Sequence, residues 1–305
     1  MIEPGGTLAR VLRAGHFAVT GEIVPPRSAD GSSVTEHARE LVGSVDAVNV
    51  TDNPQASPFM TPVAGVRFAA EAGIEPTVQI TCRDRNSLGI TADLLGAWAL
   101  GARNAFFLAG DPLSVGDHPD AAAVFDLSAN EAVALARRMR DEGTTLAGAT
   151  LEVSPSFMIG VAELPLADPY DPAKLEARLD AGADFVMTQI AYDVEALAAW
   201  TDVVRPRGLF ERASVMVGVT PLRSAKQARF LNEKLFGVSV PAAMIEALDD
   251  AGDGAREVGL DLTVDIVKAI RGIDGVAGVH LMGIGDDAAV RAVVEGAGLF
   301  PRPVV

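Results

Sequence analysis

The chain has 305 residues, of which 49% are hydrophobic, and its formal net charge is −16. A chain of this length buries a large core, either as one α/β barrel or as two ordinary domains. The acidic balance argues against nucleic acid and anionic membranes as partners, because both would be repelled.

The sequence contains no uncharged apolar run long enough to span a bilayer, and Met1 to Pro4 lack the basic-then-apolar pattern of a signal peptide. We therefore expect a cytoplasmic protein that does not enter membranes. Cys82 is the only cysteine, which excludes an internal disulfide. No zinc-binding spacing connects it to the four histidines, so no metal site is expected. These histidines are His16, His37, His118 and His280.

The first predicted strand, residues 17–24, carries the most informative acid of the chain. Pro25 and Pro26 have no amide hydrogens, so they end the strand and place Glu22 near its C-terminal end. Burying a carboxylate costs several kcal/mol unless it is paired, solvated or protonated. From this segment alone, Glu22 is either a reactive acid or an acid that faces water.

Short β-branched or aromatic runs alternate with amphipathic segments along the rest of the chain, as in repeated βα units. The predicted strands are 17–24, 46–50, 77–81, 104–108, 157–162, 185–189, 214–217 and 278–282. The predicted helices are 34–42, 61–72, 92–100, 129–141, 174–181, 194–204, 225–235 and 261–271. Gly101 and Gly182 follow two of these helices shortly before the next strand, as helix C-caps do.

This order of elements, with no linker between them, predicts an α/β fold: a single (β/α)8 TIM barrel that spans residues 1–305 as one domain. The alternative is a two-domain Rossmann enzyme, but no G-x-G-x-x-G follows the first strand. Gly283-Ile284-Gly285-Asp286 appears only after the last strand and is interpreted as a tight turn, with a phosphate contact as the alternative.

In a barrel, the C-terminal ends of the strands meet at one mouth, where catalytic groups gather. Two carboxylates and a carboxamide there suit a neutral, donor-rich heterocycle and a step that needs a proton. Cys82 is interpreted as a buried thiol and His118 as a solvated loop residue. The polar residues expected at the mouth are Glu22, Thr51, Asp52, Asn53, Thr81, Cys82, Arg83, Asp84, Asp111, Glu163 and Gln189.

Several motifs together resemble those of the methylenetetrahydrofolate reductase family. They run in family order from about residue 17 to 282, and their joint spacing is more specific than any one of them. The motifs are Gly21-Glu22-Ile23-Val24-Pro25-Pro26-Arg27, Val48-Asn49-Val50-Thr51, Thr81-Cys82, Leu108-Ala109-Gly110-Asp111, Ala181-Gly182-Ala183-Asp184-Phe185 with Thr188-Gln189 and Asp193, and Lys226-Gln227-Ala228.

The resemblance implies a barrel oxidoreductase that reduces 5,10-methylenetetrahydrofolate to 5-methyltetrahydrofolate with NADH or NADPH. It implies Glu22 as the general acid and Asp111 as the acid on the pterin. It also implies two sets of binding residues. The substrate set is Gln189, Asp111, Thr51, Arg27 and Lys226, and the cofactor set is Thr51, Thr81, Gly110 and Gln189.

The resemblance also implies FAD, which most of the family carries in the barrel mouth, but the positions that contact this flavin depart from the family pattern. Ala109 and Ala225 replace a polar and an aromatic contact, and Glu163 and Leu164 stand where a stacking ring is expected. We also expect the acid of Glu163 to repel a pyrophosphate. These departures predict direct hydride transfer without flavin. An FAD-dependent ping-pong enzyme, with the lost contacts covered by Phe157, Tyr170 or loop amides, is the alternative, and a non-catalytic folate-binding barrel subunit is a third. NADH against NADPH and the oligomeric state stay open.

Overall fold

A computed structural model describes residues 4–305. Most of the segment on which a signal peptide was judged, Met1 to Pro4, lies outside the described residues.

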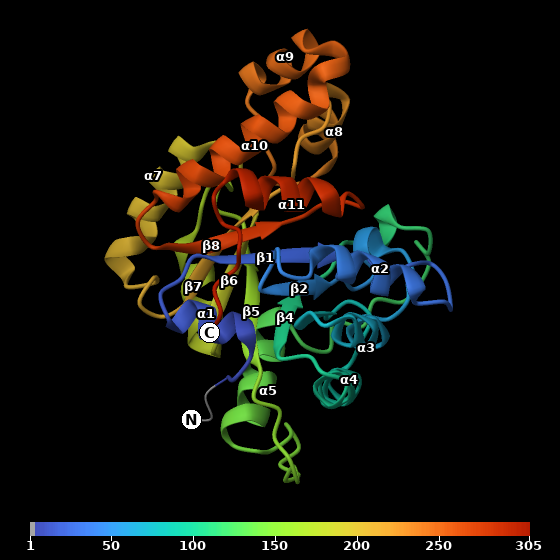
Figure 1. Ribbon diagram of the computed structural model, residues 1–305. Coiled ribbons are helices and arrows are strands. Elements are labelled where there is room, and N and C mark those ends of the chain that lie inside the picture. Colours follow the sequence, from blue (N-terminus) through green and yellow to red (C-terminus); the bar gives the residue numbers. More distant parts are fainter. Residues whose placement is uncertain (1–3) are drawn as a thin grey trace.

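The strands form one closed, all-parallel barrel in chain order, as Figure 1 shows. They are β1 (Ala18–Ile23), β2 (Ala47–Val50), β3 (Pro76–Thr81), β4 (Asn104–Leu108), β5 (Met158–Glu163), β6 (Phe185–Ile190), β7 (Ser214–Val219) and β8 (Val276–Leu281). Every predicted strand is present, with ends displaced by at most two residues. The predicted TIM barrel is therefore confirmed.

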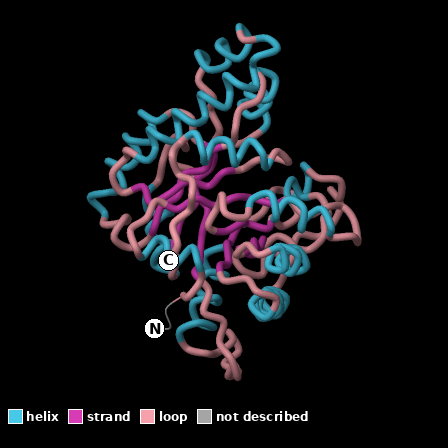
Figure 2. Tube along the Cα trace, in the orientation of Figure 1, coloured by secondary structure: helices cyan, strands magenta, loops and turns pink. Residues whose placement is uncertain are grey.

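Helices follow the strands and surround the barrel (Figure 2). Those that the sequence predicted are α2 (Ser32–Leu41), α3 (Pro62–Ala72), α4 (Ser87–Ala99), α5 (Ala129–Asp141), α6 (Pro172–Ala181), α7 (Val194–Val204), α8 (Ala225–Lys234) and α10 (Ala255–Arg271). Four of them begin earlier than predicted, α2 and α6 by two residues, α4 by five and α10 by six. The Asn86 side chain caps α4 by accepting from the main-chain amide of Gly89, and α10 starts at Ala255 rather than at Asp261.

Three helices were missed: α1 (Thr7–Arg13), α9 (Ala242–Asp250) and α11 (Asp287–Gly296). The shortest, α1, has only seven residues, too few for a helical period to stand out. Helices α8 and α9, with part of α10, project from the barrel in Figure 1. No helix within residues 4–305 is both long and apolar enough to cross a membrane.

Alternate strand residues fill the barrel interior, and α1 closes its N-terminal end. Leu8 and Val11 of α1 pack with Phe106, Phe185 and other inward residues in one buried cluster. The intervening residues, such as Val19 and Ile23 of β1, instead belong to the larger cluster between barrel and helices. Since the bottom is filled by apolar side chains, the opposite end of the barrel is where polar groups collect.

The strand period places Glu22 inside that opposite end. Ala18 of β1 lies in the interior cluster, and Thr20 and Glu22 follow at intervals of two on the same face. The β1–β2 register pairs Glu22 with Asn49, and the β1–β8 register pairs Thr20 with His280. Glu22 is the fifth of the six strand residues, so its carboxylate reaches the mouth.

Candidate functional site

A cavity of about 470 Å³ occupies the barrel mouth, on the side formed by the ends of β1 to β5 and the loops after them. Its lining mixes carboxylates, arginines and apolar side chains. The residues are Glu22, Thr51, Asp52, Asn53, Pro54, Gln79, Thr81, Arg83, Phe107, Leu108, Ala109, Gly110, Asp111, Ala129, Val161, Ala162, Leu164 and Arg178.

Glu22 is only partly open to solvent, with a side chain 20% exposed. Its carboxylate lies 3.7 Å from the imidazole of His280, measured from Oε2 to Nε2. No arginine or lysine of the described chain forms an ion pair with it. Glu22 is thus a carboxylate at the edge of an apolar barrel with a titratable side chain as its neighbour, an arrangement suited to proton transfer.

Asp111 stands in the loop after β4 and is exposed. Its carboxylate accepts a 2.9 Å hydrogen bond from the main-chain amide of Gln55, in the loop after β2. Its carbonyl oxygen accepts from Arg83 at 3.1 Å. Gly110, immediately before it, has φ +96°, and a Cβ there would lie 3.0 Å from the Cβ of Arg83. The turn that presents Asp111 is therefore fixed from two sides.

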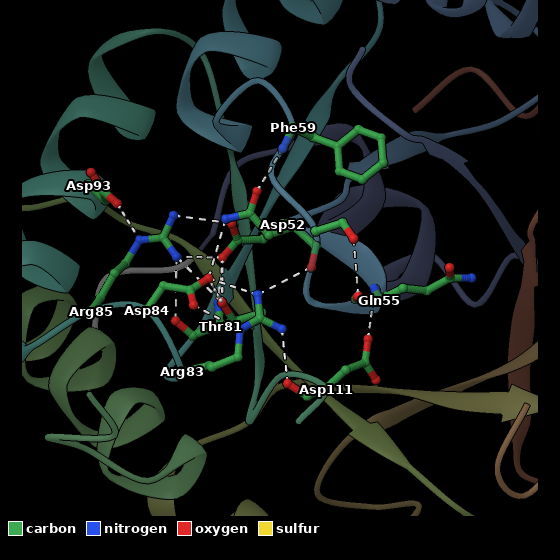
Figure 3. Close-up of polar contacts among 11 residues, drawn as sticks. Asp52, Gln55, Phe59, Thr81, Arg83, Asp84, Arg85, Asp93 and Asp111 are labelled. Carbon is green, nitrogen blue, oxygen red and sulfur yellow. Dashed lines mark hydrogen bonds and ion pairs between the residues drawn. The ribbon is translucent and has the colours of Figure 1, made fainter. Parts of the chain in front are cut away.

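Beside this turn lies a network of charged side chains around the buried Arg83, drawn in Figure 3. Arg83, which is 1% exposed, binds both carboxylate oxygens of Asp84 and the carbonyl of Asn53. The hydrogen bond from Arg83 holds the pKa of Asp84 below its usual range. This arginine joins the loops after β2, β3 and β4, so it fixes the shape of the mouth.

A second arginine supports the same loops. Arg85 binds Asp52 at 2.6 Å and Asp93 at 2.7 Å. Asp52 also accepts from the main-chain amide and the hydroxyl of Thr81, at 2.7 and 2.9 Å. Because its hydroxyl is used in this way, Thr81 serves the framework of the cavity wall.

The cavity therefore brings together five of the predicted site residues: Glu22, Thr51, Thr81, Gly110 and Asp111. Thr51 is buried, and its hydroxyl has no hydrogen-bond partner among the described residues. A buried hydroxyl without a partner is costly, so a ligand atom at this wall would satisfy it.

Three predicted binding residues lie outside the cavity lining. Gln189 uses both ends of its side chain, since Oε1 accepts from Ile190 and Nε2 donates to the carbonyl of Phe236. Arg27 is half-exposed and pairs with Asp117 of the β4–α5 loop at 2.8 Å. Lys226 is exposed on the first turn of α8.

The charge expected of Glu163 needs correction. Glu163 is 4% exposed and its carboxylate pairs with Arg178 at 2.5 Å, so the pair carries no net charge into the cavity. Ala225 stands at the start of α8, where the sequence placed it, and is buried. Phe157, a possible substitute for the lost flavin contacts, precedes β5 at the closed end of the barrel, where it packs edge-on against Trp98.

Sequence reasoning missed the roles of His280, Arg178 and Arg85. His280 had one usable signal, because it alternates in phase with the inward residues of its strand. Arg178 and Arg85 pair with acids on other elements of the fold, Glu163 and Asp52, and no local sequence pattern predicts such pairings.

The remaining candidates carry no chemistry at the mouth. Cys82 is fully buried, and burial raises the pKa of its thiol to about 11. His118 is exposed beside Asp117, 3.1 Å from its carboxylate. Within residues 4–305, no group of three or more His, Cys, Asp or Glu side chains is arranged to hold a metal ion.

Comparison with known proteins gives a consistent result. Residues 7–298 match the family model for methylenetetrahydrofolate reductase. The Escherichia coli 5,10-methylenetetrahydrofolate reductase is 24% identical over 295 residues, which cover 94% of this chain and 93% of that protein. Methylenetetrahydrofolate reductase 1 of Schizosaccharomyces pombe is 25% identical over 300 residues, 92% of this chain. The chain spans less than half of that yeast relative, because the match covers 45% of it.

Among solved structures, the fold resembles a Clostridium thermocellum protein described as binding two copies of 5-methyl-5,6,7,8-tetrahydrofolic acid. The TM-score is 0.64 at 14% identity, with 95% of this chain and 97% of that one covered. At this identity the likeness supports the barrel fold alone. Because the family model covers nearly the whole chain, however, the protein belongs to the methylenetetrahydrofolate reductase family.

Proposed function

We propose that the protein reduces 5,10-methylenetetrahydrofolate to 5-methyltetrahydrofolate, with a nicotinamide dinucleotide as hydride donor. The observation that carries the proposal is the placement of Glu22 and Asp111 in one cavity of a chain that belongs to this family. The E. coli relative, which this chain matches over almost its full length, bears the name of that activity.

Charge in the cavity supports these roles. Five charged residues line it, and both arginines are engaged, Arg83 with Asp84 and Arg178 with Glu163. Asp52 is likewise neutralised by Arg85. Glu22 and Asp111 are the lining carboxylates that no arginine or lysine of the described chain pairs with. The cavity thus offers two acids to a substrate that is rich in hydrogen-bond donors and becomes cationic during the reaction.

Glu22 acts in the first step. Opening the five-membered ring of the substrate requires a proton on the departing ring nitrogen, and the carbon bridge is then left as an iminium cation. Glu22 donates or relays this proton, since it is the titratable group at the base of the cavity. The dinucleotide, when bound, supplies the hydride that reduces this cation.

Asp111 holds the pterin. Its carboxylate has two oxygens, and the Gln55 amide occupies one hydrogen-bond position, which leaves acceptor capacity for the donor edge of a pterin. A carboxylate at this position also stabilises the developing iminium charge. Thr51, with its buried free hydroxyl, is a second contact on the neighbouring wall.

We also propose that Gln189, Arg27 and Lys226 act at the rim. For Gln189 to reach a substrate, its hydrogen bond to Phe236 must open, since that bond holds its amide group against the loop after α8. Arg27 and Lys226 are exposed cations suited to the glutamate tail or to the phosphates of the dinucleotide.

Direct hydride transfer without flavin is the finer part of the proposal. Ala109 is exposed at the cavity edge and its side chain offers neither charge nor a hydrogen bond, and Leu164 offers no ring. The lining arginines are already paired with carboxylates, so neither is free for the pyrophosphate of a flavin nucleotide. The alternative is the FAD-dependent route, in which loop amides replace these contacts.

One assay tests the activity. Purified protein is mixed with methylenetetrahydrofolate and NADH or NADPH, and the nicotinamide absorbance is followed. We expect oxidation that depends on the folate and disappears when it is omitted. If folate binds without any oxidation of either dinucleotide, the protein is a folate-binding barrel and the proposed activity is wrong.

A further inference from the structure

His280 is buried inside the barrel with a partner on each ring nitrogen. It lies on β8, opposite Thr20 of β1 in the register, and is 4% exposed. Its Nδ1 shares a 2.9 Å hydrogen bond with the hydroxyl of Thr20. Its Nε2 lies 3.7 Å from the carboxylate of Glu22. The Thr20 bond fixes the ring, so the other nitrogen is aimed at the acid above it.

Among the described residues, no second acid forms an ion pair with this imidazole. The adjacent strand β7 places Gly218 opposite His280, and a glycine contributes no side chain. The preceding inward residue of β7 is the apolar Met216, and the residue opposite Glu22 on β2 is the neutral Asn49. Within residues 4–305, Glu22 is the only acidic side chain within 4.0 Å of His280.

The separation shows how the two groups interact. A contact of 3.7 Å is too long for a direct hydrogen bond, so the coupling is electrostatic or passes through one water molecule. In the partly dehydrated interior of the barrel, such a coupling is stronger than it would be at the surface.

We infer that His280 is a positioning residue for Glu22. His280 holds the Glu22 carboxylate toward the mouth and sets the pH range over which this acid gives up its proton. This inference deepens the proposed function, because it concerns the same acid. The contact between the two residues can nevertheless be tested without any turnover.

The first test needs neither a bound ligand nor turnover. Histidine side chains are labelled with ¹⁵N, and His280 is followed by NMR across pH in the wild type and in Glu22→Gln. The protein has only four histidines, so the His280 signal can be assigned by its loss in His280→Asn. We expect its titration midpoint to move to lower pH in Glu22→Gln, because removing a negative neighbour disfavours the imidazolium. An unchanged midpoint overturns the inference, even if the enzyme is active.

The second test uses turnover. His280→Asn keeps an amide near Thr20 but withdraws the group that faces Glu22, whereas His280→Gln extends an amide toward Glu22. We expect His280→Asn to lower kcat by about 10- to 100-fold while KM for the folate changes by less than about twofold, with partial recovery in His280→Gln. The acid-dependent limb of the kcat–pH profile should move to higher pH, since the variant lacks the imidazole, which favours the carboxylate whenever it carries a proton.

Two further variants separate this role from a structural one. Thr20→Val removes the Nδ1 partner and should reproduce the pH shift in weaker form. His16→Asn, an exposed histidine at the closed end of the barrel, should leave kcat and the profile unchanged. If His280→Asn lowers kcat with an unmoved pH profile, or if its limb moves to lower pH, His280 does not act through Glu22 and the inference is wrong.

Discussion

The main-chain amide of Gln55 donates a 2.9 Å hydrogen bond to the carboxylate of Asp111, which joins the loop after β2 to the loop after β4. Gln55 and Ala56 both have positive φ, +54° and +51°, and neither is a glycine. Such a conformation costs on the order of 1 kcal/mol or more per residue and persists only where surrounding contacts enforce it. Asp111 is thus part of what holds the loop in this shape.

This bond predicts different outcomes for two substitutions of Asp111. Asp111→Asn retains an oxygen for the Gln55 amide but loses the charge, so folate affinity and kcat should fall together while the loop keeps its shape. Asp111→Ala loses both the charge and the oxygen that accepts from Gln55. It should therefore also make the loop at residues 53–57 more open to proteolysis. Folate binding by calorimetry, turnover and limited proteolysis measure the three effects. Folate affinity and rate that stay at wild-type values in Asp111→Asn would remove Asp111 from the site.

Glu22→Gln tests the general acid. The amide has nearly the size of the carboxylic acid and keeps its hydrogen-bonding capacity, but it cannot donate a proton on demand. We expect kcat to fall by about 100- to 10,000-fold with folding and folate binding nearly intact. The measurement is steady-state turnover beside a melting curve and a folate titration. A variant with more than about half of the wild-type rate would show that another group supplies the proton.

The Arg83–Asp84 pair predicts a pH dependence of stability. The hydrogen bond from Arg83 lowers the pKa of Asp84 in the folded state, so the pair stabilises the fold fully above the unfolded value of about 4. That contribution is lost as the pH falls from about 4 through the lowered folded value. Asp84→Asn should therefore melt below the wild type at pH 7, and the gap should narrow at pH 3. Asp120→Asn, an exposed acid of the β4–α5 loop, is the matched control and should show no such narrowing. A gap that is as wide at pH 3 as at pH 7 would contradict the assignment.

The fold could be predicted because each strand has a recognisable pattern in its local sequence. The stop at Pro25 and Pro26 and the glycines after helices mark boundaries that depend on a few neighbouring residues. Helix α1 escaped because its stability comes from closing the barrel, where Leu8 and Val11 meet Phe106 and Phe185. That packing is a tertiary effect with no signature in seven residues.

For the candidate site, the positions of residues could be predicted from the sequence, but their side-chain partners could not. Strand ends located Glu22 and Asp111, because a barrel brings all such ends to one mouth. Side-chain pairing was not predictable: Glu163 appears in the sequence as a free acid, yet Arg178, fifteen residues away, neutralises it. Gln189 likewise appears as a free amide, and only the folded loop shows that Phe236 engages it.

The last prediction concerns the flavin. We expect the protein to purify colourless, to remain active without added FAD, and to show sequential kinetics, because direct transfer needs both substrates in the mouth at once. The correction at Glu163 removes one reason for this expectation, since a neutralised acid does not repel a pyrophosphate. The expectation now rests on Ala109 and Leu164, which offer a flavin neither charge nor a ring, and on lining arginines that are already paired.

A visible spectrum before and after NADH, followed by initial rates at varied concentrations of both substrates, decides between the routes. Yellow protein bleached by NADH alone, with parallel-line kinetics, would establish the flavin route, because a cofactor that stores the hydride separates the reaction into two halves. The roles proposed for Glu22 and Asp111 would survive that result, since protonating the folate and holding its pterin are required whichever group delivers the hydride.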